Sequence, residues 1–474
     1  MLSGLRDYQR KNTLELMAMV QRRVPAFLYY LPTAGGKTTV FVRLALLLMQ
    51  QLNFNIVIFV HRKELLWQTQ RTLKNLGIDA GVIAPGYQPT SHKIHVASID
   101  TVGSRLGSLK DFLSTIDFAI FDEAHHIVAS SWGRVLAALS NALILGVSAT
   151  PWRQDGKPLG SVFVDVVRGP TKAQLIKWGY IAPSVVFAPE LNVDLTGITK
   201  RGGDFARGEL ARAMDHEELI TPVVKAYSKF CPGVPTITFC AGVDHAFNVS
   251  EAFKRAGWMS TNLDGRMSPQ EREKAINGLG CGNYQNLTSC DIVSEGTDIP
   301  IVGAALHLRP TQSTALYDQQ NGRTFRLYEG KEHSTIVDFV GNWTVHGLPE
   351  TDRQWSLRDG LISIDVNNSE LKRCPRCFRV HHVADTCPSC GRVHQKRNSQ
   401  FTPLSDKELR GMPGIRQHSA LKIKEMKFQT LMQIGETEKD FQRIAKIKGF
   451  RPEWVAEVMQ RKHDMKRAGR RGRY

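Results

Sequence analysis

The stretch Leu31–Thr39, Leu-Pro-Thr-Ala-Gly-Gly-Lys-Thr-Thr, decides how the rest of the chain is interpreted. An apolar run, 26–31, precedes it and a longer one, 40–48, follows, so the pattern predicts a strand, a glycine-rich turn and a helix. Adjacent glycines let backbone N–H groups approach an anion, and the helix N-terminus adds a positive dipole end. The stretch therefore predicts a phosphate-binding loop, although Leu31 and Ala34 stand where such loops usually have glycine. The alternative is an ordinary glycine-rich turn with an exposed lysine, and residues further along the chain decide between the two.

The polar side chains of this loop have expected partners. Lys37 is placed to reach the β- and γ-phosphates of a nucleotide, and the Thr38 hydroxyl suits Mg²⁺. The other loop residues that we expect to line the phosphates are Thr33, Gly35, Gly36 and Thr39.

Charge and composition point to a soluble protein with a polyanionic partner. The 474 residues suffice for about three domains, and the net charge is +17. Two short segments, 372–397 and 461–474, each hold seven Lys or Arg against one acidic residue, so the strongest nucleic-acid signal lies near the C-terminus. Residues 1–23 fit no signal or transit sequence, and the most apolar helix, 40–52, is too short to span a bilayer.

Two series of short apolar runs alternate with helical segments, which predicts an α/β fold of two tandem parallel sheets. The runs of the first series are 26–31, 55–60, 94–99, 118–121 and 143–147. Those of the second series are 235–240, 286–291, 303–308 and 334–340. The predicted parts are a first α/β domain (1–165), a connector (166–225), a second α/β domain (226–345), a linker or arm (346–371), a cysteine-rich ribbon (372–397) and a basic helical module with an arginine-rich tail (398–474).

Two adjacent carboxylates, Asp122 and Glu123, directly follow the apolar strand 118–121. The carboxyl ends of parallel strands face the ligand crevice, so the pair should lie beside the phosphate loop. There Asp122 could hold Mg²⁺, and Glu123 could orient and deprotonate the water that attacks the γ-phosphate.

With these residues the chain resembles a superfamily 2 helicase with a DEAH box, Asp122–His125. Further segments match the family's motifs in the family's order: 5–9, 60–66, 98–101, 148–150, 295–300 and 319–326. The resemblance covers about residues 1–345 and implies two RecA-like domains that bind ATP and Mg²⁺. The run 338–349 also resembles phage and prophage helicases of the group that includes repair helicases and restriction-enzyme motor subunits. This sub-assignment implies a bacterial host cytoplasm if the chain is phage-encoded.

The resemblance also implies roles for individual residues. Arg323 and Arg326 would be arginine fingers, and Gln9 would read adenine. Other residues implied for the nucleotide site are Gly296, Asp298 and Gln319. Those implied to grip nucleic acid are His61, Arg62, Thr101 and Thr297. Trp152, beside the coupling motif 148–150, is the best tryptophan candidate for stacking on a base, whereas Trp132 and Trp178 are expected in the core or at an interface.

Four clustered cysteines, Cys374, Cys377, Cys387 and Cys390, have the spacing of a zinc ribbon. Two tight knuckles can bring four thiolates to one tetrahedral Zn²⁺, which leaves no open position, so the zinc is expected to be structural. Three nearby histidines, His381, His382 and His394, could serve as alternative ligands, but surface positions are the preferred interpretation. Arginines around the cluster, with Arg373 and Arg376 foremost, favour contact with nucleic acid, and docking of a protein is the alternative.

Together these expectations describe an ATP-dependent, nucleic-acid-stimulated helicase or translocase. Its preferred substrate is DNA, single-stranded, forked or branched, and its partners would include replication or repair proteins. An RNA helicase of the same architecture and a non-unwinding platform that binds or loads onto DNA remain as alternatives.

Overall fold

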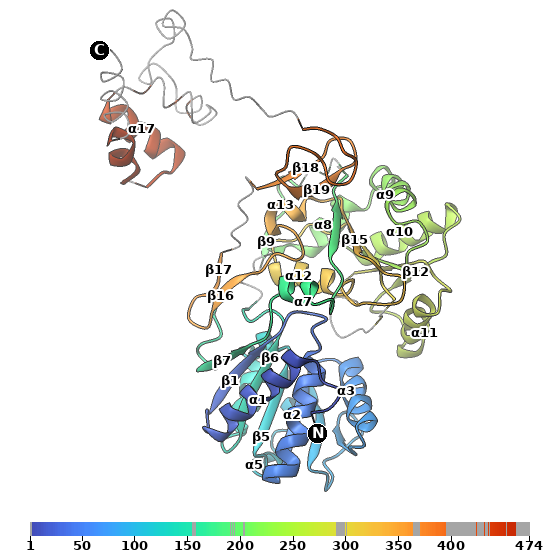
Figure 1. The fold of residues 1–474 in the computed structure, drawn as a ribbon, viewed down its shortest axis with the longest axis vertical. Coiled ribbons are helices and arrows are strands. Elements are labelled where there is room, and N and C mark those ends of the chain that lie inside the picture. Colours follow the sequence, from blue (N-terminus) through green and yellow to red (C-terminus); the bar gives the residue numbers. More distant parts are fainter. Residues whose placement is uncertain are drawn as a thin grey trace, which may run out of the picture. The chain divides into compact units, whose positions relative to one another are not determined.

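The computed structural model describes residues 2–153, 158–189, 191, 193, 195–201, 204–290, 299, 301–363, 370–394, 423, 431, 435, 437–451 and 453–460. It divides into two compact units, Met1–His394 and Gln395–Tyr474. The larger unit contains two lobes, each built on its own sheet (Figure 1). Among the described residues, no helix combines the length and apolar character needed to cross a bilayer.

The first lobe is a seven-stranded parallel sheet in the order β3-β4-β2-β5-β6-β1-β7. Its strands are β1 Ala26–Tyr30, β2 Ile56–Val60, β3 Gly81–Ile83, β4 Ile94–Ser98, β5 Phe118–Asp122, β6 Leu143–Ser148 and β7 Asp165–Arg168. The helices that cover it are α1 Asp7–Gln21, α2 Lys37–Leu52, α3 Lys63–Asn75, α4 Ile99–Ser104, α5 Lys110–Ser114, the 3-10 turn η1 Ala124–His126 and α6 Ser130–Ala138. Apolar side chains on both faces of this sheet form two separate buried clusters, as expected for parallel strands with helices on each side.

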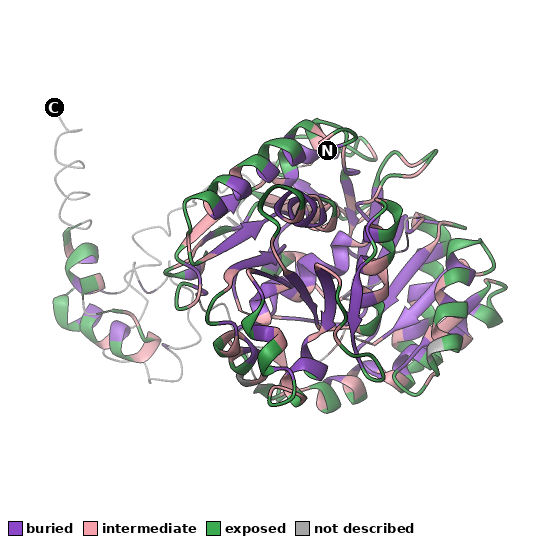
Figure 2. Cartoon of the chain, turned by 90° about the horizontal axis from the view of Figure 1, so that it is seen from below, coloured by how far each residue is buried: buried purple, intermediate pink, exposed green. Residues whose placement is uncertain are grey.

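The second lobe is an eight-stranded sheet in the order β12-β13-β11-β14-β15-β8-β19-β18. Its strands are β8 Ser184–Phe187, β11 Thr236–Phe239, β12 Ser260–Leu263, β13 Asn286–Ser289, β14 Ala304–His307, β15 Ser334–Asp338, β18 Leu371–Arg373 and β19 Arg379–His382. The helices from this part of the chain are α7 Lys172–Lys177, α8 Arg207–Met214, α9 Glu217–Phe230, α10 Val243–Arg255, α11 Pro269–Gly280, α12 Thr314–Gly322 and α13 Asn342–His346. Figure 2 shows that the strands of both sheets are buried, whereas many helices have one exposed face.

The predicted connector, 166–225, contributes to both lobes. Strand β7 pairs with β1 in the first sheet, and β8 pairs with β15 in the second. Helix α7, which lies between these strands in sequence, packs its buried Leu175 against the core of the first lobe. The segment also contains a two-stranded ladder of β9 Lys200–Arg201 and β10 Asp204–Phe205, which precedes α8.

The predicted arm, 346–371, also packs against the protein. Its hairpin, β16 Gln354–Ser356 and β17 Gly360–Ser363, inserts Trp355 into the core of the first lobe. The Trp355 ring meets Tyr30 edge-on at 5.2 Å, and the guanidinium of Arg168 lies 3.8 Å from its centroid. This one tryptophan therefore anchors the arm to the first lobe.

The smaller unit contains α17, Glu438–Lys448. Thr437 caps its N-terminus, and Gly449 ends it with a left-handed φ of 73°. Phe441 and Ile444 on this helix form a buried cluster with Val455 and Val458. The tail, 461–474, lies outside the described residues.

Candidate nucleotide and metal sites

The phosphate loop lies between β1 and α2 and depends on two left-handed residues. Gly36, with φ 87°, begins α2, and Ala34 has φ 66°. A side chain at Gly35 would place its Cβ 2.7 Å from Leu31 Cγ. Glycine at 35 and 36 is therefore required by space and by backbone geometry, whereas Ala34 adopts a conformation that costs an L-residue about 1 kcal/mol.

Two residues of α1 brace this loop. The Tyr8 hydroxyl donates to the carbonyl oxygen of Gly35 at 2.6 Å, and Gln9 Nε2 donates to the same oxygen at 3.3 Å. A Cβ at Gly36 would lie 2.6 Å from Gln9 Nε2. Gln9 thus touches the loop directly, while its implied role in reading adenine remains a prediction. Trp178, expected in the core or at an interface, is 48% exposed and stacks on Tyr8 with ring centroids 6.1 Å apart.

The carboxylate pair lies at the carboxyl end of β5. Asp122 is 5% exposed, and Glu123 follows with a left-handed φ of 53° and donates its N–H to Asp122 Oδ1 at 3.0 Å. Burial, aided by repulsion from Glu123, raises the pKa of Asp122 to about 6, and the positive charge of Lys37 opposes that rise. Asp122 and Lys37 are therefore close enough to interact electrostatically. The strand order β5-β6-β1 predicts this proximity.

Histidines connect the carboxylate pair to two other motifs. His125 Nδ1 lies 3.3 Å from Ser148 Oγ and 3.4 Å from Glu123 Oε2. The His126 ring lies 4.1 Å from the His125 ring and 5.3 Å from the His61 ring, measured between centroids. His61, implied as a nucleic-acid contact, is thus part of a ring array beside the carboxylates.

Other predicted nucleic-acid contacts have different surroundings. Arg62 is the N-cap of α3 and is partly exposed, whereas Thr101 in α4 is only 7% exposed. The prediction that Trp152 stacks on a base is wrong, because its side chain is 1% exposed and fills the core of the first lobe. Trp132 lies in the core as expected. Gly296, Thr297 and Asp298 lie outside the described residues.

The carboxyl end of α12 reaches the phosphate loop from the second lobe. A Cβ at Gly322 would lie 2.4 Å from Thr33 Cγ2, so only glycine permits this approach. Arg323 and Arg326 follow immediately, each partly buried, and Gln319 is 5% exposed on the same helix. Between the two arginines, Phe325 packs into the core of the first lobe. The predicted fingers are therefore held where the two lobes meet.

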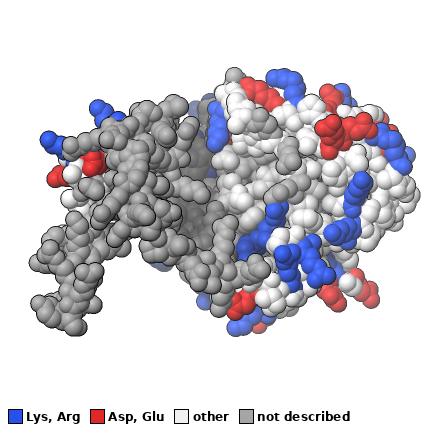
Figure 3. Space-filling view, turned by 90° about the horizontal axis from the view of Figure 1, so that it is seen from above, with Lys and Arg blue, Asp and Glu red and all other residues white. Residues whose placement is uncertain are grey.

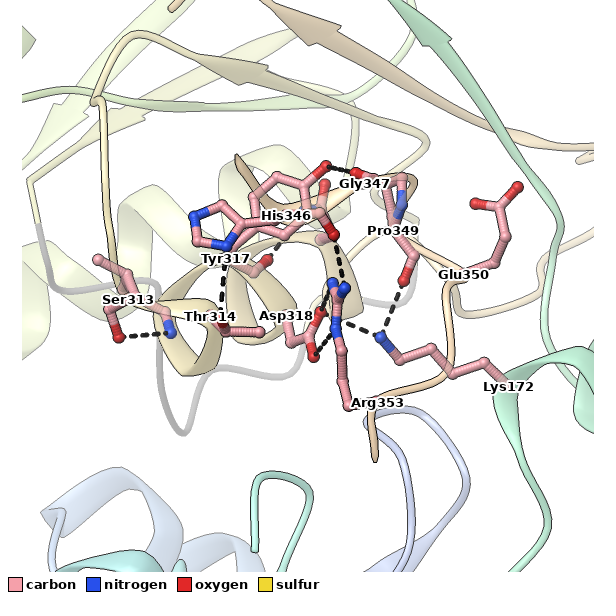
Figure 4. Close-up of polar contacts among 12 residues, drawn as sticks. Lys172, Ser313, Thr314, Tyr317, Asp318, His346, Gly347, Pro349, Glu350 and Arg353 are labelled. Carbon is pink, nitrogen blue, oxygen red and sulfur yellow. Dashed lines mark hydrogen bonds and ion pairs between the residues drawn. The ribbon is translucent and has the colours of Figure 1, made fainter. Parts of the chain in front are cut away.

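A buried ionic cluster holds α12 in position (Figure 4). The sequence alone did not reveal this cluster. Lys172 Nζ lies 3.1 Å from Asp318 Oδ1, and Arg353 Nη2 lies 2.9 Å from the same oxygen. Burial opposes ionisation of Asp318, but the two cations outweigh it and lower its pKa. Lys172 is on α7 and Arg353 is on the arm. The cluster therefore joins α12 to two segments that pack on the first lobe.

Lys331 supports the segment 323–326, which carries the two predicted arginine fingers. Its ammonium donates to the carbonyl oxygens of Val302, at 2.9 Å, and Arg326, at 2.8 Å, and also to that of Thr324. Burial lowers the pKa of Lys331 to about 8. Neither Lys331 nor Asp318 belongs to a motif with a recognisable spacing, so the sequence offered no signal for them.

The four predicted zinc ligands converge. The sulfur atoms of Cys374 and Cys390 are 3.7 Å apart, those of Cys377 and Cys387 are 3.5 Å apart, and all four lie within 4.8 Å of one another. Sulfur atoms at the corners of a tetrahedron around Zn²⁺ would be separated by about 3.8 Å, so the donor set fits this ion.

The ribbon is continuous with the second lobe. Strand β19 pairs antiparallel with β8, and Val380 is 2% exposed within the lobe's core. Arg373 donates to the carbonyl oxygen of Ala188 at 3.2 Å, whereas Arg376 is exposed. The expectation of a surface position is wrong for His381, which is 6% exposed because it lies on this shared strand.

Comparison with known proteins identifies both lobes. Residues 2–153 match the family model "Type III restriction enzyme, res subunit", and residues 223–328 match "Helicase conserved C-terminal domain". A 51.5 kDa protein of a Lactococcus phage is 26% identical over 349 residues, which are 73% of this chain and 73% of the phage protein. The yeast protein described as "Putative ATP-dependent helicase IRC3", from Saccharomyces cerevisiae, is 30% identical over 380 residues, 76% of this chain and 55% of the yeast protein.

A solved structure shares the fold. The ATP-dependent Type ISP restriction-modification enzyme LlaBIII, bound to DNA, superposes with a TM-score of 0.55 at 16% identity, over 71% of this chain and 27% of that enzyme. The chain thus spans about half the length of the yeast relative and about a quarter of the restriction enzyme.

Proposed function

Because the chain belongs to superfamily 2 of helicases, we propose that it is an ATP-dependent motor that moves along DNA or separates its strands at forks and branches in replication, recombination or repair. The observation that carries this proposal is the approach of α12 to the phosphate loop, where Gly322 abuts Thr33. Arginines from one lobe beside the phosphates bound by the other make hydrolysis depend on closure of the two lobes.

The residues of the cleft suit a magnesium nucleotide. Asp122 has a pKa of about 6 because it is buried beside Glu123, so a nearby cation would favour its ionised form. Thr38 and Asp122 are the residues that would hold Mg²⁺, which supplies charge neutralisation at the phosphates when it is bound.

The remaining side chains divide the work of hydrolysis. Lys37 and the N–H groups of the loop bind phosphate oxygens, and Glu123 orients a water molecule and takes its proton. Arg323 and Arg326 stabilise the charge that develops on the transferred phosphoryl group. His125 contacts both Glu123 and Ser148, and so connects the residue that activates the water molecule with the coupling motif 148–150.

Two features favour DNA as the nucleic-acid substrate. The restriction enzyme that shares this fold was solved bound to DNA. Figure 3 views the molecule from above the orientation of Figure 1 and shows basic side chains gathered on part of the visible surface. Arg376 of the ribbon is exposed. Cations on such a face can bind backbone phosphates without reading sequence.

ATP hydrolysis measured with single-stranded, duplex and forked DNA and with RNA tests the proposal. Forked DNA should stimulate turnover most. Lys37→Ala and Glu123→Gln should each lower stimulated turnover by about 100-fold or more, with DNA binding retained, because both act on the phosphoryl transfer. Lys11→Ala is the matched control, since the Lys11 side chain is 76% exposed on α1 and should be dispensable.

Results of the ATPase assay that contradict the proposal would indicate one of two other functions. Stimulation by RNA alone would make the chain an RNA helicase of the same architecture. Absence of stimulated turnover in the unaltered protein would leave a platform that binds or loads onto DNA without unwinding it.

A further inference from the structure

A second group of metal-ligating atoms lies beside the four cysteines of the ribbon. His381 Nε2 and His394 Nε2 are 3.2 Å apart, and a ring nitrogen of each histidine lies within 4.8 Å of Cys387 Sγ. His381 is 6% exposed, and Cys387 is 2% exposed. Two imidazoles and a thiolate are donors that Zn²⁺ and similar ions prefer.

The protonation state of His381 suits a ligand. Its Nδ1 lies 2.6 Å from the carbonyl oxygen of His382, so Nδ1 must carry the proton and donate it. In the neutral ring Nε2 then has a free lone pair, and this atom faces His394. Histidines that bind metals commonly fix their tautomer through such a carbonyl contact.

Backbone contacts set the position of His394. Its N–H donates to the carbonyl oxygen of Asp385 at 2.8 Å, and the adjacent residue Val393 pairs with Thr386 in an antiparallel bridge. Both histidines are therefore presented by the β-structure that also carries the cysteine knuckles. Two nitrogen ligands on one tetrahedral ion would be about 3.3 Å apart, given metal–nitrogen bonds of about 2.0 Å. The observed separation of 3.2 Å agrees with that value.

We propose that the ribbon binds a second divalent metal ion, held by His381, His394 and Cys387, with the Cys387 thiolate shared between this ion and the four-cysteine site. Four thiolates around one Zn²⁺ leave a net charge of −2, and a second divalent cation neutralises it. The second site has three protein ligands, so its fourth position is available to water or to an anionic oxygen. Its ion should consequently exchange faster than the enclosed one.

The metal content of the full, untagged chain tests the proposal. After zinc loading and removal of unbound ion, elemental analysis should give two zinc ions per chain. His381→Ala and His394→Ala should each give one, and retention of that one shows that the ribbon is still folded. His382→Ala is the matched control and should retain two, because the exposed His382 contributes only its backbone carbonyl.

A second measurement separates the two ions by their chemistry. A chromophoric chelator should remove one zinc rapidly and the other slowly from the unaltered chain, and only the slow phase should remain in His394→Gln. One zinc per chain in the unaltered protein, or two in the double variant His381→Ala/His394→Ala, would overturn the proposal. Since both readouts count metal, either result leaves the ATPase proposal untouched.

Discussion

Ala34 in the phosphate loop and Glu123 after β5 both occupy the left-handed region, with φ values of 66° and 53°. Non-glycine residues are rare there, and local strain of this kind often accompanies function. At Glu123 the conformation turns the chain directly after β5, beside Asp122. The sequence identified Ala34 as a departure from the usual loop, but only the backbone angle explains why glycine is usual there.

Replacing Ala34 by glycine should stabilise the protein in the absence of nucleotide. Relief of the left-handed strain outweighs the added flexibility of glycine, so we expect a gain of up to about 1 kcal/mol in the free energy of unfolding of the first lobe. Urea titration followed by tryptophan fluorescence measures it. Ala18→Gly in α1 is the matched control, because Ala18 is exposed in a regular helix and its loss should cost about 1 kcal/mol. Equal destabilisation by both changes would contradict the strain argument.

The residues of the first lobe that we expect to bind nucleotide could be proposed from sequence because they follow strand ends at recognisable spacings. Lys172, Asp318 and Arg353 were not, because their partnership joins positions 146 and 35 residues apart. A single sequence offers no pattern for such an ion cluster, since each residue taken alone is an ordinary charged residue. Only the packing of α7, α12 and the arm brings them together.

At the scale of an element, α12 depends on this cluster for its position. Asp318→Asn should destabilise the chain by about 3–5 kcal/mol, because two buried cations, Lys172 and Arg353, lose their counter-charge. Glu251→Gln is the control: its partner Lys254 is 49% exposed, and such surface pairs contribute at most about 1 kcal/mol. Urea unfolding of the variants and the unaltered chain gives the comparison. A loss no larger for Asp318→Asn than for Glu251→Gln would show that the cluster does not hold α12.

The same carboxylate predicts a dependence on pH. The pKa of Asp318 is lowered in the folded chain, against burial, by Arg353 and Lys172. The contribution of Asp318 to the free energy of unfolding is therefore present at pH values above its ordinary pKa of about 3.8. It is lost as the pH falls below that value. The difference in stability between the unaltered chain and Asp318→Asn should stay constant from pH 7 to about 5 and shrink towards pH 3.5. A difference that grew on acidification would contradict this assignment.

Strands were easier to predict where they are apolar and central than where they are short and peripheral. The run 118–121 corresponds to β5, which is buried throughout. By contrast β7, Asp-Val-Val-Arg, and β16, Gln-Trp-Ser, are three or four residues long and carry polar ends. Their pairing is determined by neighbours distant in sequence, so local pattern could not reveal it.

For the whole molecule, the prediction of two RecA-like parallel sheets with a four-cysteine cluster and C-terminal helices is confirmed. The sequence did not reveal that the ribbon continues the second sheet through β19 and β8. Zinc-ribbon spacing describes ligands within one small segment and contains no information about the surface on which that segment packs. The burial of Val380 in the second lobe's core is the physical reason for the attachment.

Loss of the four-cysteine site should therefore loosen the second lobe. In Cys377→Ser, backbone amides of β8 should exchange hydrogen for deuterium faster, because β19 no longer covers that edge. Amides of β1 in the first lobe should be unchanged. Cys281→Ser is the control, since Cys281 is exposed and lies outside the cluster. Unchanged exchange in β8 would mean that the strand pairing survives without the knuckle.

The anchoring of Trp355 has a mechanical consequence. Within the described residues the chain passes from the first lobe to the second between β7 and β8, and returns to the first lobe between α13 and β16. A body tethered at one point can rotate in any direction, whereas two tethers in parallel remove some of these degrees of freedom. Relative motion of the two lobes should therefore be more restricted than a single connection would make it, with load shared by two lengths of backbone. A single cut in the chain would not release one lobe from the other.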